Sequence, residues 1–487
     1  MQQVNFTERH ALHDVATTRQ LEQQAQQALP LHHLMARAGM AVAKLALAIA
    51  PHAKRIWVAA GPGNNGGDGL EAAMHLQRCG KQPLVSWLGS PEHAPADTRI
   101  SYQNAVDAGV QFVDAPPESH DLCIDALLGI GSQLREPTGS MADWIVHINS
   151  QRAPVLAVDV PTGLQADTGA ACTFRVKASH TLSLMTLKPG LFTSHGRDLA
   201  GSIWLDDLQA GQAFNRATAT SPPSAWLAGR PTTSMRAHAS HKGSYGDVVV
   251  IGGAKGMTGA AVLAASAALH GGSGRVFVSL LDEQSMPLDP TQPELMFRAM
   301  SALAWDHMTV VTGCGGGKAM AAELPQLLKS ARQLVIDADG LNAIADSTQL
   351  QALLRERGQQ QRATVLTPHP LEAARLLACG TAEVQANRLE AAQQLARRFA
   401  CTVVLKGSGT LIARSDSAPV INPTGNARLA TGGTGDVLAG LIGARLAGGL
   451  NAFDAACQAV YQHGCVADNW PPDLALTASQ LAKALTS

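Results

Sequence analysis

The sequence predicts an α/β fold divided into two domains. An apolar strand, a glycine-rich loop and a helical pattern follow one another at residues 56–79 and again at residues 247–269. Strands that alternate with helices in this way form parallel sheets. The length of 487 residues corresponds to about two to three domains. Because an aperiodic segment rich in Ala, Thr, Ser and Pro separates the halves, we expect domains at residues 1–212 and 236–487, joined by a linker at residues 213–235.

The composition excludes several classes of partner. The chain is 46% hydrophobic, 15% charged and 4% aromatic, with a formal net charge of −1. It lacks the basic excess that attracts nucleic acid or an anionic membrane, so neither is an expected partner, and small polar substrates are favoured. The eight cysteines have no zinc spacing, which indicates reduced thiols in a cytoplasmic protein. The N-terminus has no signal-peptide pattern, and the best membrane candidate, residues 40–50, is too short and contains Lys44.

The first half opens with two helical patterns at residues 17–50, followed by a strand at residues 56–60. The strand leads into a glycine loop at residues 61–69 and a helix at residues 70–79, which together form a nucleotide-type βα unit. The next strand, at residues 83–88, ends without the acidic residue that a dinucleotide site uses to hold ribose hydroxyls. Ordinary binding of an NAD cofactor is therefore disfavoured.

The glycine loop carries polar side chains that a plain phosphate cradle does not need. Asn64, Asn65 and Asp68 stand within it, and they indicate a site that also holds sugar hydroxyls or a cation. Two later strand ends carry Asp125 and Asp159, and in an open parallel sheet such ends face the ligand crevice. Capping of the turn after the strand explains these two aspartates about as well.

A weakly held monovalent cation fits three of these positions. Asn65, Asp125 and Thr162 supply hard oxygen ligands with one formal negative charge, which suits such an ion better than zinc.

The second half restarts the α/β pattern with strands at residues 247–251 and 276–281. A small-residue helix begins at Ala260, where a flat ligand could approach the backbone, although tight packing of the helix on the sheet explains it at least as well. Later strand ends carry GCGGG, DADGLN and TPHP at residues 313–317, 337–342 and 367–370.

The last predicted strand ends at Lys406 and a glycine turn. A lysine followed by free backbone N–H groups is a plausible clamp for a polyphosphate, whereas a lysine on a surface hairpin is the ordinary alternative. The sequence has no GxxxxGK[ST], so this is not a P-loop protein.

The stretch at residues 422–450 joins a glycine- and threonine-rich loop to an apolar helix. The N-terminus of such a helix binds anions. Asp436 stands in its first turn, and a carboxylate beside an anion site is suited to take a proton from an attacking hydroxyl. These features predict a phosphoryl-transfer centre. The alternative is an aspartate that merely stabilises the start of its helix.

The ordered motifs are more specific than any single one. The first half, through LMARAG, GPGNNGGDG, DALLGIG and DVPTG, resembles the NAD(P)H-hydrate epimerase family. The second half, through HKGSYG, GMTGAA, GCGGG, DADGLN, TPHPLE, KGSGT and NPTGNARLATGGTGDVLAG, resembles the ribokinase-like ADP/ATP-dependent NAD(P)H-hydrate dehydratase family. The resemblance covers nearly the whole chain and implies a Rossmann-like three-layer domain followed by a ribokinase-like α/β domain.

The resemblance implies metabolite repair. An isomerase would interconvert the R and S hydrates NADHX and NADPHX, and a lyase would dehydrate the S form with ADP, releasing AMP and phosphate. ATP is the alternative nucleotide. The implied ions are potassium in the epimerase and Mg²⁺, with ADP, in the dehydratase. We also expect a homo-oligomer.

The resemblance assigns roles residue by residue. In the epimerase half it implies a potassium site at Asn65, Asp125 and Thr162, a proton-transfer role and hydrate contact for Asp159, and further hydrate contacts at Asn64, Asn65, Gly66, Gly67, Asp68, Gly129, Ile130, Gly131, Ser132, Gln133, Leu134 and Arg135. In the dehydratase half it implies Asp436 as the base, hydrate contacts at Ala260, Gly315, His369 and Asp436, and nucleotide contacts at Lys406, Gly407, Ser408, Gly409, Thr410 and Gly435.

Departures from the family pattern are few. Cys314 stands where proline is expected, Leu371 where glycine is frequent, and Thr162 replaces the commoner serine. They affect loop shape more than proton chemistry. The main alternative is a ribokinase-like kinase for a vitamin or sugar alcohol, fused to a nucleotide-binding module. A non-catalytic sensor role for the first half is a second alternative.

Overall fold

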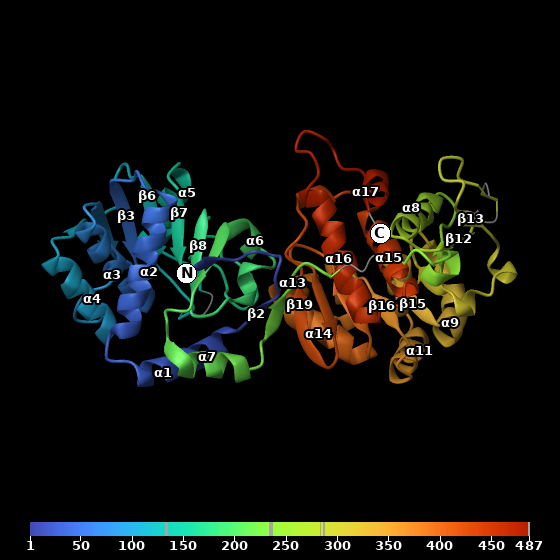
Figure 1. Cartoon of the computed structure of the whole chain (residues 1–487), viewed down its shortest axis with the longest axis horizontal. Helices are drawn as coiled ribbons and strands as arrows, with labels where there is room; N and C mark the ends of the chain where they lie inside the picture. Colours follow the sequence, from blue (N-terminus) through green and yellow to red (C-terminus); the bar gives the residue numbers. More distant parts are fainter. Residues whose placement is uncertain (132–134, 233–236, 283, 286–287, 486–487) are drawn as a thin grey trace. The chain divides into compact units, whose positions relative to one another are not determined.

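A computed structural model describes residues 1–131, 135–232, 237–282, 284–285 and 288–485 of the chain. The chain forms two compact units, one of Met1–Phe6 with His10–Trp226 and one of Thr7–Arg9 with Leu227–Ser487 (Figure 1). Each unit contains a largely parallel sheet with helices packed against it. The predicted α/β class is therefore confirmed. Within the part that the structure describes, none of the helices combines the length and apolar character needed to cross a bilayer.

The first unit contains a sheet whose strands run in the order β1-β9-β8-β7-β6-β3-β4-β5, parallel throughout except for β1. Its strands are β1 (Gln2–Gln3), β3 (Arg55–Ala60), β4 (Gln82–Trp87), β5 (Gln111–Phe112), β6 (Leu122–Ala126), β7 (Val155–Val158), β8 (His180–Leu184) and β9 (Ser202–Asp206). Its helices are α1 (Val15–Ala28), α2 (His33–Ile49), α3 (Asn64–Arg78), α4 (Ala96–Asp107), α5 (Ser140–Ser150), η1 (Pro189–Leu191), α6 (Gly196–Leu199) and α7 (Gly211–Thr220).

Alternation along β3 shows why this sheet needs helices on both faces. Ile56 and Val58 pack into one apolar core, whereas Trp57 and Ala59 pack into another. Both sets are fully buried. Strands with two apolar faces require a layer on each side, which gives the predicted three-layer arrangement. The strand order reverses between β3 and β6, and such a reversal opens a ligand crevice at the carboxyl ends of the strands.

The second unit has strands in the order β13-β12-β11-β14-β15-β16-β17-β18-β19, parallel as far as β17 and antiparallel beyond it. Its strands are β11 (Asp247–Gly252), β12 (Arg275–Leu280), β13 (Met296–Phe297), β14 (Thr309–Thr312), β15 (Gln333–Ile336), β16 (Thr364–Leu366), β17 (Thr402–Leu405), β18 (Leu411–Arg414) and β19 (Ser417–Ile421). The short strands β2 (His10–Leu12) and β10 (Ala225–Leu227) stand next to the points where the chain passes from one unit to the other.

The helices of the second unit follow the βα alternation expected from the sequence. They are η2 (Lys242–Tyr245), α8 (Thr258–His270), η3 (Met300–Ala302), η4 (Trp305–His307), η5 (Gly317–Ala319), α9 (Met320–Ser330), α10 (Ala338–Ala345), α11 (Thr348–Gln359), α12 (Pro370–Leu377), α13 (Thr381–Ala386), α14 (Arg388–Phe399), η6 (Ala427–Leu429), α15 (Thr434–Ala447), α16 (Ala452–Asp468) and α17 (Ala478–Ala484).

Helix α15 is held in place by small residues. A Cβ on Gly440 would lie 1.9 Å from the carbonyl oxygen of Ala264 in α8, so only glycine permits this approach of the two helices. The apolar side chains of Val437, Leu438 and Leu441 are buried. The packing therefore fixes where the N-terminus of α15, with Asp436, meets the sheet.

Two local predictions differ from the structure. The polar glycine stretch after β3 is helical, because α3 begins at Asn64 rather than at residue 70. A Cβ on Gly66 would lie 1.9 Å from the carbonyl oxygen of Gly61, so this glycine serves close helix packing and not a loop. The segment at residues 213–235 also contains most of α7 and all of β10. Phe214 anchors α7, since its side chain is buried in the core of the first unit.

Candidate functional sites

The first unit has a cavity of about 510 Å³ beside the point where the strand order reverses. Helices α1 and α2, the start of α3 and the loops after β6, β7 and β8 contribute to its wall. Among the lining residues are Arg19, Glu22, Asn64, Asn65, Asp68, Asp97, Gly129, Ile130, Gly131, Asp159 and Lys188.

Asp159 is the best-fixed charged group of this cavity. It follows β7 with a φ of 68°, a left-handed conformation that is uncommon for residues other than glycine. Its carboxylate forms an ion pair with Lys188, and its Oδ1 accepts a hydrogen bond of 3.2 Å from the backbone N–H of Leu184. Lys188 is fully buried and also donates to the carbonyl oxygen of Leu184 at 2.7 Å. Backbone and lysine together set the position of this carboxylate.

Further acidic groups face Asp159 across the cavity. Burial raises the pKa of Asp68 well above its usual range, and the charges of Asp159 and Glu22 add to the rise. Burial likewise raises the pKa of Glu22, again with a contribution from Asp159. Arg19 brings a cation to the same wall and donates to the carbonyl oxygens of Ile130 and Gly131 at 3.2 and 2.9 Å. The cavity thus contains carboxyl groups that hold a proton more readily than an exposed carboxyl group does.

Of the predicted potassium ligands, Asn65 lines the cavity, whereas Asp125 and Thr162 are fully buried and do not line it. Asp125 is fully buried, and its oxygens accept hydrogen bonds from the Oγ1 and backbone N–H of Thr162 at 2.7 and 2.8 Å. Burial raises the pKa of Asp125 to about 6, against the lowering effect of these hydrogen bonds. The side-chain amide nitrogen of Asn65 is buried and has no hydrogen-bond partner among the described residues. The donor set is three oxygens with one charge, which fits a monovalent cation.

The other epimerase-half residues occupy several places. Gly66 and Gly67 are buried within α3. Arg135 is exposed and is not among the residues that line the cavity. Ser132, Gln133 and Leu134 lie outside the described residues.

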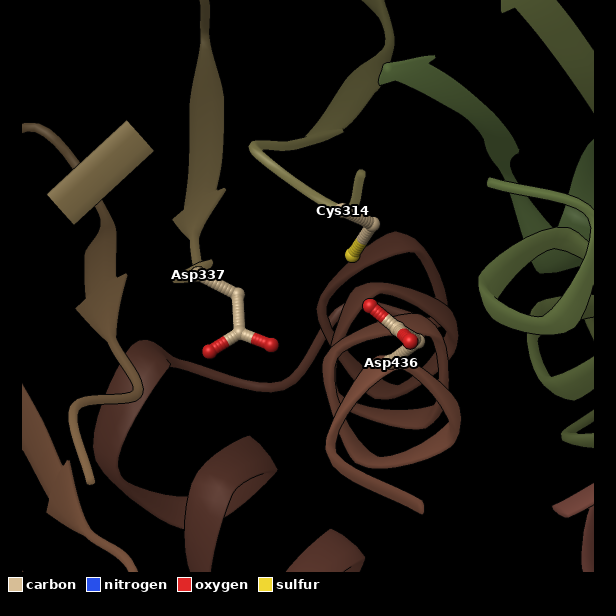
Figure 2. A group of neighbouring side chains, drawn as sticks. All are labelled: Cys314, Asp337 and Asp436. Carbon is tan, nitrogen blue, oxygen red and sulfur yellow. The ribbon is translucent and has the colours of Figure 1, made fainter. Parts of the chain in front are cut away.

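The second unit gathers its polar groups where the parallel strands end. Figure 2 shows Cys314, Asp337 and Asp436, whose side chains point toward one another from the loop after β14, the end of β15 and the first turn of α15. Their ligand atoms lie within 4.8 Å of one another. Burial and the charge of Asp337 raise the pKa of Asp436 to about 6, while the Cys314 thiol and Lys406 act in the opposite direction. A carboxylate with this pKa is a competent general base at neutral pH.

Lys406 begins the hairpin turn between β17 and β18, but its side chain is mostly buried and lies beside carboxylates. Its Nζ is 2.6 Å from Oδ1 of Asp337 and 4.0 Å from Oε2 of Glu372. Burial lowers the pKa of Lys406, but these two charges outweigh it and raise the pKa above its ordinary value. A Cβ on Gly435 would lie 3.4 Å from this Nζ. The structure therefore brings Lys406 to the N-terminus of α15.

The turn after Lys406 connects β17 to β18. Gly407 and Gly409 both have positive φ, and the Thr410 hydroxyl donates to the carbonyl oxygen of Gly407 at 3.0 Å. The guanidinium of Arg388 supports the turn from below, donating to the carbonyl oxygen of Lys406 at 3.2 Å. Together with Ser408, the turn is a compact loop beside the lysine.

The predicted hydrate contacts flank this cluster. His369 caps α12: its Nδ1 accepts from the backbone N–H of Leu371 at 3.1 Å, and its Nε2 lies 3.3 Å from Oε1 of Glu372. Burial lowers the pKa of His369, which favours the neutral ring. On the β14 side, a Cβ on Gly315 would lie 2.9 Å from the Cβ of Ala260. Gly315 and the start of α8 therefore lie close together, and their contacts with the hydrate stay predictions.

Sequence reasoning missed several charged residues of both sites. Lys188, Glu22 and Arg19 received no role, and neither did Asp337 or Glu372. Lys188 and Asp337 each stand shortly after an apolar strand, which is the signal that identified Asp159. Glu22 and Arg19 lie in a polar helix of mixed pattern, and only the packing of α1 shows that they face a cavity.

Comparison with known proteins agrees with this division into two sites. The family described as YjeF-related protein N-terminus matches residues 31–190, and the family described as NAD(P)H-hydrate dehydratase matches residues 248–487. A bifunctional NAD(P)H-hydrate repair enzyme of Escherichia coli is 36% identical over 463 residues, which cover 90% of this chain and 85% of that protein. The corresponding enzyme of Vibrio cholerae is 37% identical, with 93% of this chain and 92% of that protein covered.

The chain belongs to the bifunctional NAD(P)H-hydrate repair enzyme family. Among solved structures, it is similar to the ADP/ATP-dependent NAD(P)H-hydrate dehydratase of Bacillus subtilis co-crystallized with ATP/Mg2+, at 29% identity and a TM-score of 0.44, over 52% of this chain and 92% of that one. The family assignment matches the resemblance that the sequence motifs indicated. Each of the two units of this chain thus contains its own charged site.

Proposed function

We propose that the chain repairs hydrated nicotinamide nucleotides with both of its units. The first unit epimerises the R and S hydrates, NADHX and NADPHX. The second dehydrates the S hydrate with ADP and releases NAD(P)H, AMP and phosphate. The observation that carries this proposal is the presence, in a chain of the repair family, of one aspartate suited to proton transfer in each unit: Asp159 in the cavity and Asp436 at the start of α15.

The dehydratase reaction follows from the environment of Asp436. Its carboxylate takes the proton of the ring hydroxyl, whose oxygen attacks the terminal phosphoryl group and displaces AMP from ADP. The new phosphate ester departs with its C–O bonding electrons, driven by the lone pair of the ring nitrogen, and a ring proton is then lost. Phosphate is a far better leaving group than hydroxide. Lys406 and the N-terminus of α15 stabilise the negative charge of the phosphoryl group during transfer.

The epimerase reaction is assigned to the cavity of the first unit. Asp159 contacts the hydrate and takes part in the proton transfer. Lys188 holds its carboxylate in place, and the backbone of Asp159 is left-handed. Asp68, Asn64 and Asn65 line the same space, and the buried amide nitrogen of Asn65 has no hydrogen-bond partner among the described residues. The arrangement suits a substrate with many hydroxyl and phosphate groups better than an apolar one.

Two metal ions fit the residues present. Asn65, Asp125 and Thr162 would hold potassium, which would neutralise the buried carboxylate of Asp125 and stiffen the loops that carry it. In the second unit, Asp337 and Glu372 are buried carboxylates that fit a hard divalent cation, and Lys406 alone cannot balance them together with a polyphosphate. Mg²⁺ held there would neutralise the charge of the nucleotide phosphates.

One assay on the full chain tests the proposal. Mixed R and S hydrates are incubated with ADP or ATP, with and without potassium, and recovery of reduced nicotinamide is followed by absorbance. We expect complete conversion by the wild type and conversion of the S hydrate alone by Asp159→Asn. Full conversion of the R form by that variant contradicts the role of Asp159. A stable phosphorylated product in place of NAD(P)H supports the kinase alternative. A homo-oligomer and a cytoplasmic location stay predictions.

A further inference from the structure

Cys314 places a thiol among the carboxylates of the second site. It lies in the loop after β14, is fully buried, and its backbone carbonyl accepts a hydrogen bond of 3.0 Å from Gly253. Its Sγ and one carboxylate oxygen each of Asp337 and Asp436 lie within 4.8 Å of one another (Figure 2). The proposed dehydration gives this thiol no task.

The three groups have the chemistry of a metal site. Within the described part of the chain, the side chain of Asp337 accepts hydrogen bonds from two donors, Thr367 and Lys406. Both donors bond to its Oδ1, at 2.8 and 2.6 Å respectively. Its Oδ2 is therefore available to a cation. A thiolate and two carboxylates carry three negative charges, of which Lys406 offsets one, so a dication is electrostatically favoured.

We propose that Cys314, Asp337 and Asp436 bind a thiophilic divalent cation such as Zn²⁺ or Cd²⁺ when nucleotide is absent. Tetrahedral zinc with one sulfur and two oxygen ligands separates these ligand atoms by roughly 3.3–3.8 Å. Since the ligand atoms all lie within 4.8 Å of one another, side-chain shifts of at most about 1–1.5 Å bring them to these separations. The fourth position stays open to water.

The thiol decides which cation the site selects. Soft thiolate ligands prefer Zn²⁺ and Cd²⁺ over Mg²⁺ and Ca²⁺. Burial and the two neighbouring carboxylates raise the pKa of Cys314 well above its usual range, so the cation must displace the thiol proton. Binding breaks the S–H bond, forms the metal–sulfur bond and releases one proton to the buffer. Affinity therefore increases with pH.

The consequence for activity rests on the proposed function of Asp436. A cation held by this carboxylate removes the base, so Zn²⁺ inhibits the dehydratase. The first unit contains no group of three metal-ligating side chains of this kind among the described residues, and its epimerase reaction is the internal control within the same chain.

Titration of the full-length protein with Cd²⁺ tests binding without any substrate. Ultraviolet absorbance reports cadmium–thiolate bonds, and the matched control is Cys401→Ala, because Cys401 is another buried thiol of the same unit outside the cluster. We expect Cys314→Ala to bind one Cd²⁺ fewer and Cys401→Ala to match the wild type. Asp337→Asn should weaken binding at the cluster by at least about 10–100-fold. Equal binding by wild type and Cys314→Ala overturns the proposal.

Enzyme assays separate this inference from the function on which it rests. Zn²⁺ should slow release of NAD(P)H from the S hydrate in the wild type, MgADP should compete with it, and epimerisation should continue. If Cd²⁺ binds through Cys314 but Asp436→Asn retains hydrate turnover, the site stands and the assigned base is wrong. If Zn²⁺ inhibits Cys314→Ala as strongly as the wild type, the inhibitory site lies elsewhere and the inference fails.

Discussion

The two sites use the same pair of residue types in opposite ways. In the first unit the lysine, Lys188, pairs directly with the assigned proton-transfer group Asp159. In the second unit the lysine, Lys406, pairs with Asp337, and the assigned base Asp436 stands beside that carboxylate. A lysine fixes the position of its partner, whereas a second carboxylate makes an aspartate hold a proton more readily. Asp159 is thus held in place by its lysine, whereas the surroundings of Asp436 raise its pKa and favour acceptance of a proton.

Substitution of Asp436 gives the largest expected effect. Asp436→Asn should lower dehydratase turnover by about 10²–10⁴-fold, because general-base catalysis contributes that much, while ADP binding and epimerisation persist. The measurement is single-turnover release of NAD(P)H from the S hydrate. The control is Asp454→Asn, an exposed aspartate in the first turn of α16. Similar losses in both variants would mean that Asp436 only stabilises its helix.

Removal of the lysine in the first unit tests the other side of the comparison. Lys188→Met leaves the Asp159 carboxylate buried without its partner, and breaking such a pair costs about 3–5 kcal/mol. Urea unfolding followed by tryptophan fluorescence measures the loss for this unit, which contains the buried Trp57. The double variant Lys188→Met/Asp159→Asn should recover part of it, because no uncompensated charge remains. A double variant as unstable as the single one would contradict a charge effect.

The sequence could identify those site residues that stand at the carboxyl end of a parallel strand. Asp125, Asp159 and Lys406 each stand at such an end, and the fold gathers these ends along one edge of each sheet. The α/β class and the two-part division follow from the same βα periodicity.

The partners of these residues could not be predicted, because tertiary packing chooses them. Which carboxylate Lys406 would contact depends on the neighbouring strand, and the sequence does not specify strand order. Glu22 reaches the cavity only through the packing of α1. The start of α3 was misplaced since glycines normally disfavour helices, whereas here the lack of side chains allows the helix to touch Gly61.

The pH dependence of the dehydratase sharpens the contrast between the two aspartates. The pKa of Asp436 is raised to about 6, and only its ionised form accepts the hydroxyl proton. The rate should therefore level off above neutrality and fall about tenfold for each pH unit below the pKa. Initial rates with saturating S hydrate and nucleotide measure the profile. A midpoint near pH 4 would contradict the raised pKa of this carboxylate.

Potassium gives the smallest expected effect and tests the support of the first site. At a potassium concentration ten times its dissociation constant, binding to the native state should raise the free energy of unfolding by about 1.4 kcal/mol. Because the pKa of Asp125 is raised to about 6, protonation removes its charge below that pH, so this stabilisation should vanish as the pH falls through 6. Urea unfolding in potassium or in a large organic cation measures it.

The Thr162 hydroxyl distinguishes a cation site from general salt effects. Thr162→Val removes an oxygen that hydrogen-bonds Asp125 and should abolish the potassium response. Thr168→Val, in the same loop region but bonded to the backbone N–H of Ala170, should keep it. If both variants respond like the wild type, potassium does not bind at Asp125, and the buried carboxylate only organises the turn that presents Asp159. The first site would then depend on its lysine alone, and the comparison with the second site would rest entirely on where each lysine is placed.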